Sequence, residues 1–514
     1  MSHPEPVLHG VAASSLLDPP TLAAHDALVI VGPAPLGELA ASLGAPVAAA
    51  MNAAVLCDAS LASPRARPPV VVPAPGVPGG RLLLAPTAPL TDDVDDARAI
   101  AEATQAAIAR AVDAGARRPL LAVSRPAAAR FARAIDVAAL AALSTRWAPL
   151  EAREADKAPP RATTIGVLGL EEARAKRLSA IELGKVLCRD LTFAEPERMT
   201  PLRAAALCEE AFLGTGVTVA VERDVSAFPL LAAVARASNQ IERHRPCVVT
   251  LDYTPAGAVE RTVILAGKGV VYDTGGADLK TDGHMAGMSR DKGGAGAVAG
   301  LIRAAAELSI PGVRVIGLLG LVRNSAGEDA FVSDEIIRAR SGVRVRIGNT
   351  DAEGRLLLAD LLAAAKQMAA GAPDPLLLSV ATLTGHVYRA HGPYTGAIGN
   401  SAAASALDAL DTLGELWAEP MERSRPRRED YTMVAARTAA EDVLSANRLA
   451  SVNTPRGHQF PFAFLDVASG IKGSGLPLIH LDIGGTVAEG ADWQFGRPTA
   501  VPVATLVAYL SRGE

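Results

Sequence analysis

The feature that most constrains the fold is an alternation of short apolar runs with alanine-rich stretches. The runs "DALVIVG" at 26–32 and "RLLLAP" at 81–86 have the length of buried strands, whereas "DDARAIAEATQAAIARAVDAGA" at 95–116 has a helix-forming composition. The strand signal returns in "CVVTLDYT" at 247–254 and in "RTVILAGKGVVYD" at 261–273. Because strands that alternate with helices build layered folds, we predict an α/β fold in both halves, with a largely parallel sheet in the first.

A charged segment that contains prolines separates the two halves. At 514 residues the chain is too long for one ordinary core. Residues 150–163, "LEAREADKAPPRAT", have the composition of a linker. We therefore predict two domains: an amino-terminal α/β domain with its linker over 1–163, and a larger α/β domain over 164–514.

Composition excludes several classes of function. The formal net charge of −5 gives no electrostatic case for nucleic acid, so small substrates are favoured. The start "MSHPEPVLHG" lacks the basic and apolar regions of a secretory signal, and no uncharged run suits a bilayer span. The four cysteines have no metal-binding spacing, which favours a cytoplasmic protein with four buried thiols, Cys57, Cys188, Cys208 and Cys247.

Two fragments gather the charged residues in glycine-rich surroundings: "KGVVYDTGGADLKTDGHMAGMSRD" at 268–291 and "NTDAEGRLLLAD" at 349–360. Carboxylates are the ligands that hard and borderline divalent ions require, and two ions about 3.5 to 4 Å apart need carboxylates that bridge them. The two fragments therefore predict a metal site whose candidate ligands are four carboxylates, Asp273, Asp291, Asp351 and Glu353.

The residues alone leave other interpretations open. Asp291 precedes a helix and could be its cap. Asp351, Glu353 and Arg355 alternate, which in an extended segment puts them on one face, either as ligands or as a surface ion network. Lys268 lies in an apolar strand, so it is either a neutral metal ligand or half of an ion pair.

Together with "ATLTG" at 381–385 and "HLDIGGT" at 480–486, the two fragments resemble the signature of the leucyl aminopeptidase (cytosol aminopeptidase) family, in the wording of its probable-aminopeptidase branch. The resemblance covers roughly residues 180–510. It implies one metal held by Lys268, Asp273, Asp291 and Glu353, and a second held by Asp273, Asp351 and Glu353. Lys280 and Arg355 correspond to the catalytic pair of the family.

The same resemblance implies a metallo-aminopeptidase that hydrolyses the amino-terminal residue from peptides with a broad, apolar preference. Its cofactors would be two divalent ions per subunit, Zn or Mn with Mg as a further candidate, and bicarbonate at Arg355. A homohexamer, a macro-like amino-terminal domain and a mixed sheet in the catalytic domain are expected. The substrate pocket would be formed by Met288, Asn349, Thr384, Gly385, Gly484 and Val487.

Some residues depart from the family pattern. Arg323 stands where an acid is expected, and "ANRLASVNTPRGHQ" at 446–459 matches poorly. His284 and His386 are expected at the surface. A catalytically silent scaffold is therefore one alternative. A dinucleotide enzyme is another, because "GAGAVAG" at 294–300 is close to a phosphate-binding loop, although no strand precedes it.

Overall fold

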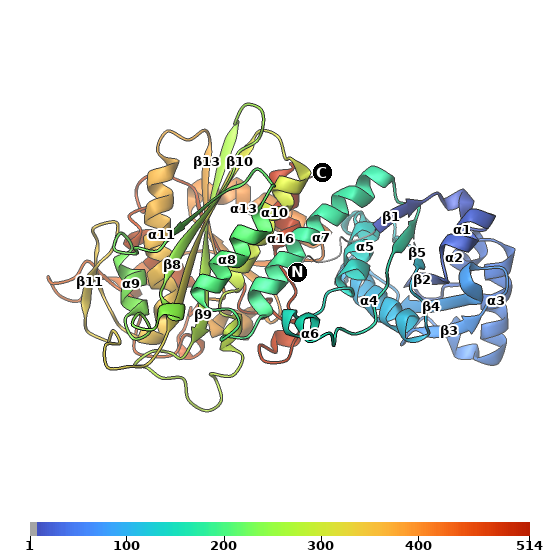
Figure 1. Cartoon of the computed structure of the whole chain (residues 1–514), viewed down its shortest axis with the longest axis horizontal. Helices are drawn as coiled ribbons and strands as arrows, with labels where there is room; N and C mark the ends of the chain where they lie inside the picture. Colours follow the sequence, from blue (N-terminus) through green and yellow to red (C-terminus); the bar gives the residue numbers. More distant parts are fainter. Residues whose placement is uncertain (1–7, 514) are drawn as a thin grey trace. The chain divides into compact units, whose positions relative to one another are not determined.

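The computed structural model describes residues 8–513, which form two compact units (Figure 1). One unit contains the residues up to Leu183 together with Gly414–Glu419, and the other contains Gly184–Leu413 and the residues from Pro420 onward. The predicted boundary between residues 163 and 164 stays a prediction. The first seven residues, on which the expected lack of a secretory signal partly depends, lie outside the described part.

The first unit has one six-stranded sheet in the order β1-β6-β5-β2-β4-β3. All neighbours are parallel except β3 and β4, so the predicted largely parallel sheet is confirmed. Its elements are β1 (Leu8–Val11), α1 (Pro19–Ala24), β2 (Ala27–Pro33), α2 (Gly37–Ser42), α3 (Ala45–Cys57), β3 (Val70–Pro73), β4 (Arg81–Thr87), α4 (Arg98–Asp113), β5 (Pro119–Val123), α5 (Ala134–Ser144), α6 (Leu150–Glu154) and β6 (Ile165–Leu168).

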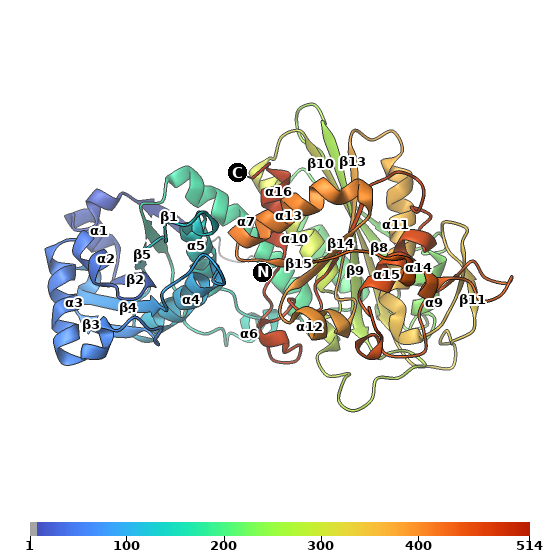
Figure 2. The same ribbon diagram turned by 180° about the vertical axis from the view of Figure 1, so that it is seen from behind.

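The second unit is built on an eight-stranded mixed sheet, as predicted, in the order β15-β14-β17-β13-β9-β10-β8-β7. Figure 2 shows this unit from behind, with β14 and β15 in view. After α7 (Glu172–Phe193) its elements are α8 (Pro201–Phe212), β7 (Thr218–Glu222), α9 (Pro229–Ala235), β8 (Cys247–Tyr253), β9 (Arg261–Asp273), α10 (Gly293–Leu308), β10 (Val313–Asn324), β11 (Ile336–Arg338), β12 (Arg344–Arg346), α11 (Glu353–Ala369), β13 (Pro375–Ala381), α12 (Gly385–His391), β14 (Thr395–Gly399), α13 (Ala404–Leu416), β15 (Met421–Ser424), α14 (Arg428–Val434), β16 (Val443–Leu444), α15 (Gln459–Ala468), β17 (Leu478–Asp482) and α16 (Val503–Leu510).

Helices cover both faces of this sheet, with α8, α10 and α16 on one side and α9 and α11 on the other (Figure 1). The "GAGAVAG" residues lie inside α10 and are buried there. A Cβ atom on Gly300 would lie 2.6 Å from the Gly184 carbonyl oxygen of α7, so these glycines permit close helix packing. The run is therefore a packing surface, which removes the dinucleotide alternative.

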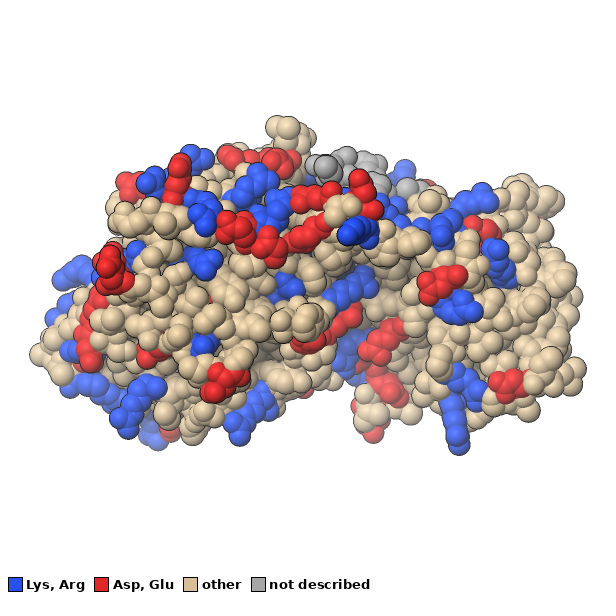
Figure 3. All heavy atoms as spheres, turned by 60° about the horizontal axis from the view of Figure 1, so that its bottom comes forward, with Lys and Arg blue, Asp and Glu red and all other residues tan. Residues whose placement is uncertain are grey.

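Surface charge and cysteine burial can be compared with the predictions made from composition. On the face drawn in Figure 3, Lys and Arg side chains are interspersed with Asp and Glu. Within residues 8–513, no helix is both long and apolar enough to cross a membrane. Cys188, Cys208 and Cys247 are buried, but the prediction for Cys57 is wrong, since it is exposed at the last residue of α3, where the helix leaves the core.

Four central strands of the second unit end at one edge of the sheet. The strands β17, β13, β9 and β10 are neighbours and run parallel. They end at Asp482, Ala381, Asp273 and Asn324. Because the carboxyl ends of parallel strands are where open α/β sheets bind their ligands, this edge is the place to examine for a site.

Candidate metal centre

Asp273 is held in place by the end of β9 and its neighbour β10. The two strands are parallel, and after a register shift between Val322 and Arg323 they place Asn324 opposite Asp273. Asp273 Oδ1 accepts hydrogen bonds from Asn324 Nδ2 at 2.8 Å and from the Gly275 amide at 2.9 Å. Its side chain is 4% exposed. Sequence reasoning missed Asn324, although its position directly after an apolar strand is the signal that identified Asp273.

The second fragment is helical, so the predicted extended segment is wrong. Asn349 accepts a hydrogen bond from the Asp351 amide at 2.7 Å, which turns residues 350–352 into a 3₁₀ turn before α11 begins at Glu353. Residues two apart in a helix are about 200° apart around its axis. Glu353 and Arg355 therefore leave the helix in different directions, although both line the same pocket.

The turn and the strand end bring the predicted ligands together. Carboxylate oxygens of Asp273, Asp351 and Glu353 lie within 4.8 Å of one another. Lys268 Nζ lies 2.7 Å from Asp291 Oδ1 and 2.8 Å from Glu353 Oε1. These five residues all line one pocket of 560 Å³, and we call them the carboxylate–lysine cluster: Lys268, Asp273, Asp291, Asp351 and Glu353.

Lys268 reaches the cluster because a glycine leaves room for it. Its side chain is 4% exposed, and its ammonium group also donates a hydrogen bond to the Thr382 carbonyl oxygen at 2.9 Å. A Cβ atom on Gly354 would lie 2.6 Å from Lys268 Cε and 2.7 Å from Lys268 Nζ. Lys268 can therefore occupy this position only because residue 354, in "DAEGR", is a glycine.

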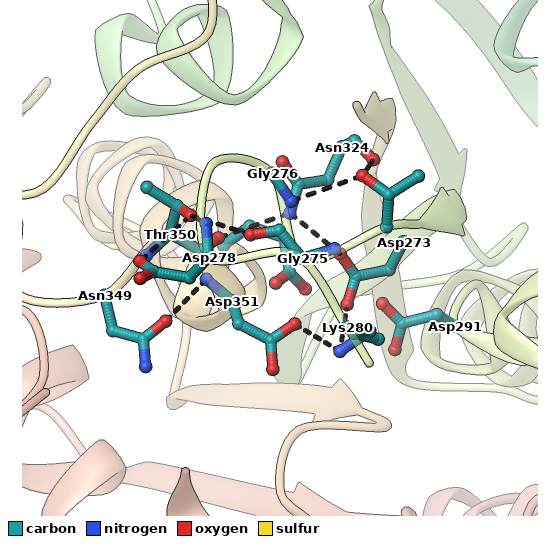
Figure 4. A network of polar contacts seen from close by, with 12 residues as sticks. Asp273, Gly275, Gly276, Asp278, Lys280, Asp291, Asn324, Asn349, Thr350 and Asp351 are labelled. Carbon is teal, nitrogen blue, oxygen red and sulfur yellow. Dashed lines mark hydrogen bonds and ion pairs between the residues drawn. The ribbon is translucent and has the colours of Figure 1, made fainter. Parts of the chain in front are cut away.

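Lys280 joins the two fragments from the loop after β9. Its ammonium group lies 2.8 Å from Asp273 Oδ2 and also contacts Asp351, and Figure 4 shows both carboxyl groups converging on it. The loop is tied down by Asp278, whose Oδ2 accepts a hydrogen bond from the Thr350 amide at 2.7 Å. Sequence reasoning missed this anchoring role of Asp278.

The close spacing of buried acids shifts the pKa values of the residues in the cluster. Burial opposes the charge of both lysines, but the surrounding carboxylates outweigh it and raise the pKa of Lys268 and the pKa of Lys280. Burial also opposes the ionisation of Asp273, but the two ammonium groups hold its pKa below the usual range. Burial raises the pKa of Asp291 well above its usual value, and burial beside Asp273 raises the pKa of Asp351 to about 7.

The cluster fits a divalent ion because its acids lack enough partners. Four carboxylates face only two ammonium groups, from Lys268 and Lys280. Asp291 Oδ2 and Glu353 Oε2 are buried and have no hydrogen-bond partner among residues 8–513. Buried carboxylate oxygens without a donor are costly, and metal ions satisfy them directly. This donor set can hold a dication.

Arg355 lies at the buried end of the pocket. Its side chain donates a hydrogen bond to the Ser445 carbonyl oxygen at 3.0 Å, and its guanidinium carbon lies 4.9 Å from the centre of the Phe460 ring. Burial lowers the pKa of Arg355 to about 10, so it remains cationic at neutral pH. It is a permanent positive charge next to the carboxylates.

The structure brings most of the predicted substrate residues to the pocket. Met288, Asn349, Thr384, Gly385 and Gly484 line it. Val487 is 4% exposed and is not among the lining residues, and it packs against the backbone at Gly293. Sequence reasoning missed other lining residues, among them Thr382, Phe460, Trp493 and the segment 448–452.

Three histidines form a second polar group, which we call the histidine cluster: the buried His458 and the half-buried His386 and His391. His458 Nδ1 lies 2.7 Å from His386 Nδ1, and His458 Nε2 lies 3.2 Å from His391 Nε2 and 2.8 Å from Ser424 Oγ. The expected surface position of His386 is met only in part, because its ring is half-buried against a histidine distant in sequence. His284 is exposed, as expected, and lines the pocket.

The unexpected cation Arg323 does not enter the carboxylates. Its Nε donates a hydrogen bond to Ser325 Oγ at 2.9 Å, and its guanidinium carbon lies 5.3 Å from the centre of the Tyr272 ring. It is absent from the residues that line the pocket. The departure from the family pattern therefore leaves the charge of the cluster unchanged.

Comparisons with known proteins agree with this arrangement. The model of the cytosol aminopeptidase family, catalytic domain, matches residues 186–507. A Caenorhabditis elegans protein named "Putative aminopeptidase" is 39% identical over 448 residues, which cover 84% of this chain and 85% of that protein. A "Probable cytosol aminopeptidase" of Thermosynechococcus vestitus is 31% identical over 70% of this chain and 69% of its own length.

Solved structures share the fold at lower identity. The leucyl aminopeptidase from Trypanosoma cruzi superposes with a TM-score of 0.81 at 22% identity, over 99% of this chain and 98% of that one. The bottromycin maturation enzyme BotP, in a complex with Mn, superposes with a TM-score of 0.76 at 24% identity, over 95% of this chain and 99% of that one.

Proposed function

Because the chain belongs to the cytosol aminopeptidase family and is therefore a metal-dependent aminopeptidase, we propose that it hydrolyses the amino-terminal residue from peptides at a dinuclear metal site. One observation supports this most strongly. The cluster gathers more carboxylate charge than its two lysines balance, and leaves Asp291 Oδ2 and Glu353 Oε2 without hydrogen-bond partners among residues 8–513.

We propose that two ions share Asp273 and Glu353. The first ion would also be held by Asp291 and by Lys268 in its neutral form, because an ammonium group has no lone pair to donate, and the second would also be held by Asp351. When bound, two such ions act as Lewis acids toward a carbonyl oxygen and lower the pKa of water. A set of carboxylate oxygens with one amine nitrogen suits Zn or Mn and, less well, Mg. The complex of BotP with Mn supports manganese as the first ion to test.

In this proposal Lys280 donates to the negative charge that develops on the scissile carbonyl oxygen. Its ammonium group contacts Asp273 and Asp351 and lines the pocket, so it would be available to the substrate when these acids hold metal instead. One well-placed donor to such an oxyanion is worth about 2.7 to 4 kcal/mol. Lys280 is therefore the proposed electrostatic catalyst.

Arg355 is proposed to hold a bicarbonate that carries a proton during the reaction. Its Nε atom is buried without a hydrogen-bond partner among the described residues, and its cationic state at neutral pH favours an anion. Phe460 and the Ser445 carbonyl oxygen hold the guanidinium group in place. Its role would be to fix the anion beside the cluster.

We propose a broad, apolar preference for the first residue of the substrate. The pocket residues predicted to contact this side chain are uncharged: Met288, Thr384, Gly385 and Gly484. The hydroxyl of Thr384 donates a hydrogen bond to Asp482 at 2.7 Å. Discrimination by apolar fit is worth about 1 to 3 kcal/mol per methylene, so we expect a graded ranking with leucine, methionine and phenylalanine ahead of glycine and acidic residues.

The assembly and location follow the family resemblance. We propose a homohexamer that acts on peptides in the cytoplasm, and the names of several relatives as cytosol aminopeptidases support the location. The silent-scaffold alternative arose from Arg323. Its contacts with Ser325 and Tyr272 remove the reason for it.

A metal-reconstitution assay tests the proposal. The protein is stripped with a chelator, its metal content is measured, and hydrolysis of leucine amide is followed on adding Zn or Mn. We expect activity to return with about two ions per chain. N-acetyl-leucine amide is the matched control, because the blocked amine cannot bind a metal. Full activity in metal-free protein, or equal cleavage of the acetylated substrate, would refute the proposal.

A further inference from the structure

The outer wall of the pocket is formed by the segment that matches the family pattern poorly. Arg448, Leu449, Ala450, Ser451 and Val452 all line the pocket. The segment begins at the catalytic end, because the Ser445 carbonyl oxygen accepts the hydrogen bond from Arg355. It therefore follows the pocket from its buried end outward.

Side-chain exposure rises along residues 445–449, which shows that the segment runs from the interior toward the surface. Ser445 is fully buried and Ala446 is 4% exposed, whereas Arg448 is exposed and Leu449 is 51% exposed. Three residues of extended chain span about 10 Å at most. Arg448 thus lies at the mouth of the pocket, within about 10 Å of the Ser445 backbone measured between Cα atoms.

Arg448 is also an available charge. Within residues 8–513, its side chain has no hydrogen bond and no ion pair. The other Lys and Arg side chains that line the pocket are engaged, Lys268 and Lys280 with carboxylates and Arg355 with Ser445. Asp278, an acid that also lines the pocket, accepts hydrogen bonds from Thr350. An anion that enters the mouth meets Arg448 without displacing an existing partner.

We propose that Arg448 is a specificity-determining residue that binds a carboxylate carried by the peptide one or two residues beyond the scissile bond. The proposal depends on the aminopeptidase function. With the amine of the substrate at the cluster, the rest of the peptide extends toward the mouth at about 3.3 to 3.6 Å per residue. A guanidinium group pairs with a carboxylate through two parallel hydrogen bonds, which makes arginine suited to this task.

Two sources can supply that carboxylate. One is the free carboxyl terminus of a dipeptide or tripeptide, and the other is an Asp or Glu side chain in a longer peptide. Two substrate pairs distinguish them. Leucyl-glycyl-glycine is compared with its amide, and leucyl-aspartyl-glycine amide is compared with leucyl-asparaginyl-glycine amide, each by kcat/KM in the metal-loaded enzyme.

The readout is the ratio within each pair. We expect the protein to favour the carboxylate partner in at least one pair by about three- to tenfold, chiefly through KM, since partly exposed ion pairs of good geometry have this strength. The preference should shrink as ionic strength rises. Arg448→Ala should abolish it, and Arg448→Lys should keep part of it. Arg425→Ala is the matched control, because Arg425 is exposed in the same unit but does not line the pocket.

The outcomes separate the two proposals. No hydrolysis of any substrate by the metal-loaded protein would refute the proposed function itself. Hydrolysis with equal rates within both pairs, or a preference that Arg448→Ala leaves intact, would overturn the role of Arg448 alone. Should the alanine variant unfold, Arg448→Gln gives the same comparison, and a preference retained there would equally overturn it.

Discussion

Lys268 and His458 are two buried side chains of the second unit that hold charge differently. In the carboxylate–lysine cluster, Lys268 is 3% exposed and carboxylates raise its pKa. In the histidine cluster, His458 is 1% exposed, and burial beside His391 and His386 lowers its pKa to about 3. Burial opposes charge in both places, so the nature of the partners decides whether the charge remains.

The difference between histidine and carboxylate partners has a consequence for function. An imidazole can donate through one ring nitrogen and accept through the other, so neutral histidines satisfy one another without a counter-ion. A carboxylate only accepts, so an excess of buried acids needs donors or cations from outside. The histidine cluster is complete in itself, whereas the carboxylate–lysine cluster is suited to bind cations.

The strongest test of this contrast removes Glu353, one of the two acids that both ions would share. Glu353→Gln deletes a charge that also pairs with Lys268, and it should lower metal content and reduce kcat/KM by about 10³-fold or more, since each 1.36 kcal/mol of lost stabilisation is a factor of ten. Metal analysis and leucine amide hydrolysis measure the two effects. Glu328→Gln, at an exposed acid of the same unit, is the control. Full metal occupancy with full activity would remove Glu353 from the ligand set.

Lys280→Ala should separate metal binding from catalysis. We expect kcat to fall about 10²- to 10³-fold because a donor to the oxyanion is lost. Metal should be retained or bound more tightly, since a cation that competes for Asp273 and Asp351 is gone. Titration of metal and steady-state kinetics measure both, with Lys280→Arg as the conservative comparison. A rise in KM at constant kcat would contradict the assigned role.

Gly354→Ala tests whether the position of Lys268 depends on the adjacent helix. A methyl group there would overlap Lys268 Nζ, which lies 2.7 Å from the added Cβ. We expect metal affinity to fall about 10- to 100-fold, as for changes that disturb the support of ligands, with a loss of about 1 to 3 kcal/mol in stability from overpacking. Gly257→Ala, in open space, is the control. Unchanged metal affinity would show that Lys268 can move freely.

The histidine cluster should make the fold sensitive to acid. A pKa of about 3 in the folded state, against about 6.5 when unfolded, means that the unfolded state binds more protons between these values. The contribution of His458 is therefore complete above pH 6.5 and is lost as pH falls toward 3, by up to about 1.4 kcal/mol per pH unit.

Denaturant unfolding at pH 7.5, 6.5 and 5.5 in metal-free protein measures this slope. His458→Gln should make it shallower, whereas His284→Gln, at an exposed histidine, should not. The same slope in the His458 variant and in the unaltered protein would mean that the cluster does not remain neutral on acidification.

Local patterns in the sequence were enough to predict the layers, the strand ends and the chemical types at the site. Asp273 follows an apolar strand and glycines follow it, and both facts lie within ten residues of sequence. The family signature then added roles for Lys280 and Arg355. The alternation of charged residues at 351–355 gave a wrong prediction of an extended segment. There the Asn349 side chain caps a turn, and α11 begins at Glu353.

Tertiary structure decided what depends on residues far apart in the chain. The sequence by itself determined the α/β layers and the acids at the strand ends, since these follow from periodicity and from turn chemistry over a few residues. Only the fold decided that Gly354 leaves room for Lys268, that His386 meets His458, and that Arg448 lines the pocket without a hydrogen bond or ion pair among residues 8–513. Contacts of this kind depend on how distant segments pack against each other. The local periodicity of the sequence contains no information about that packing.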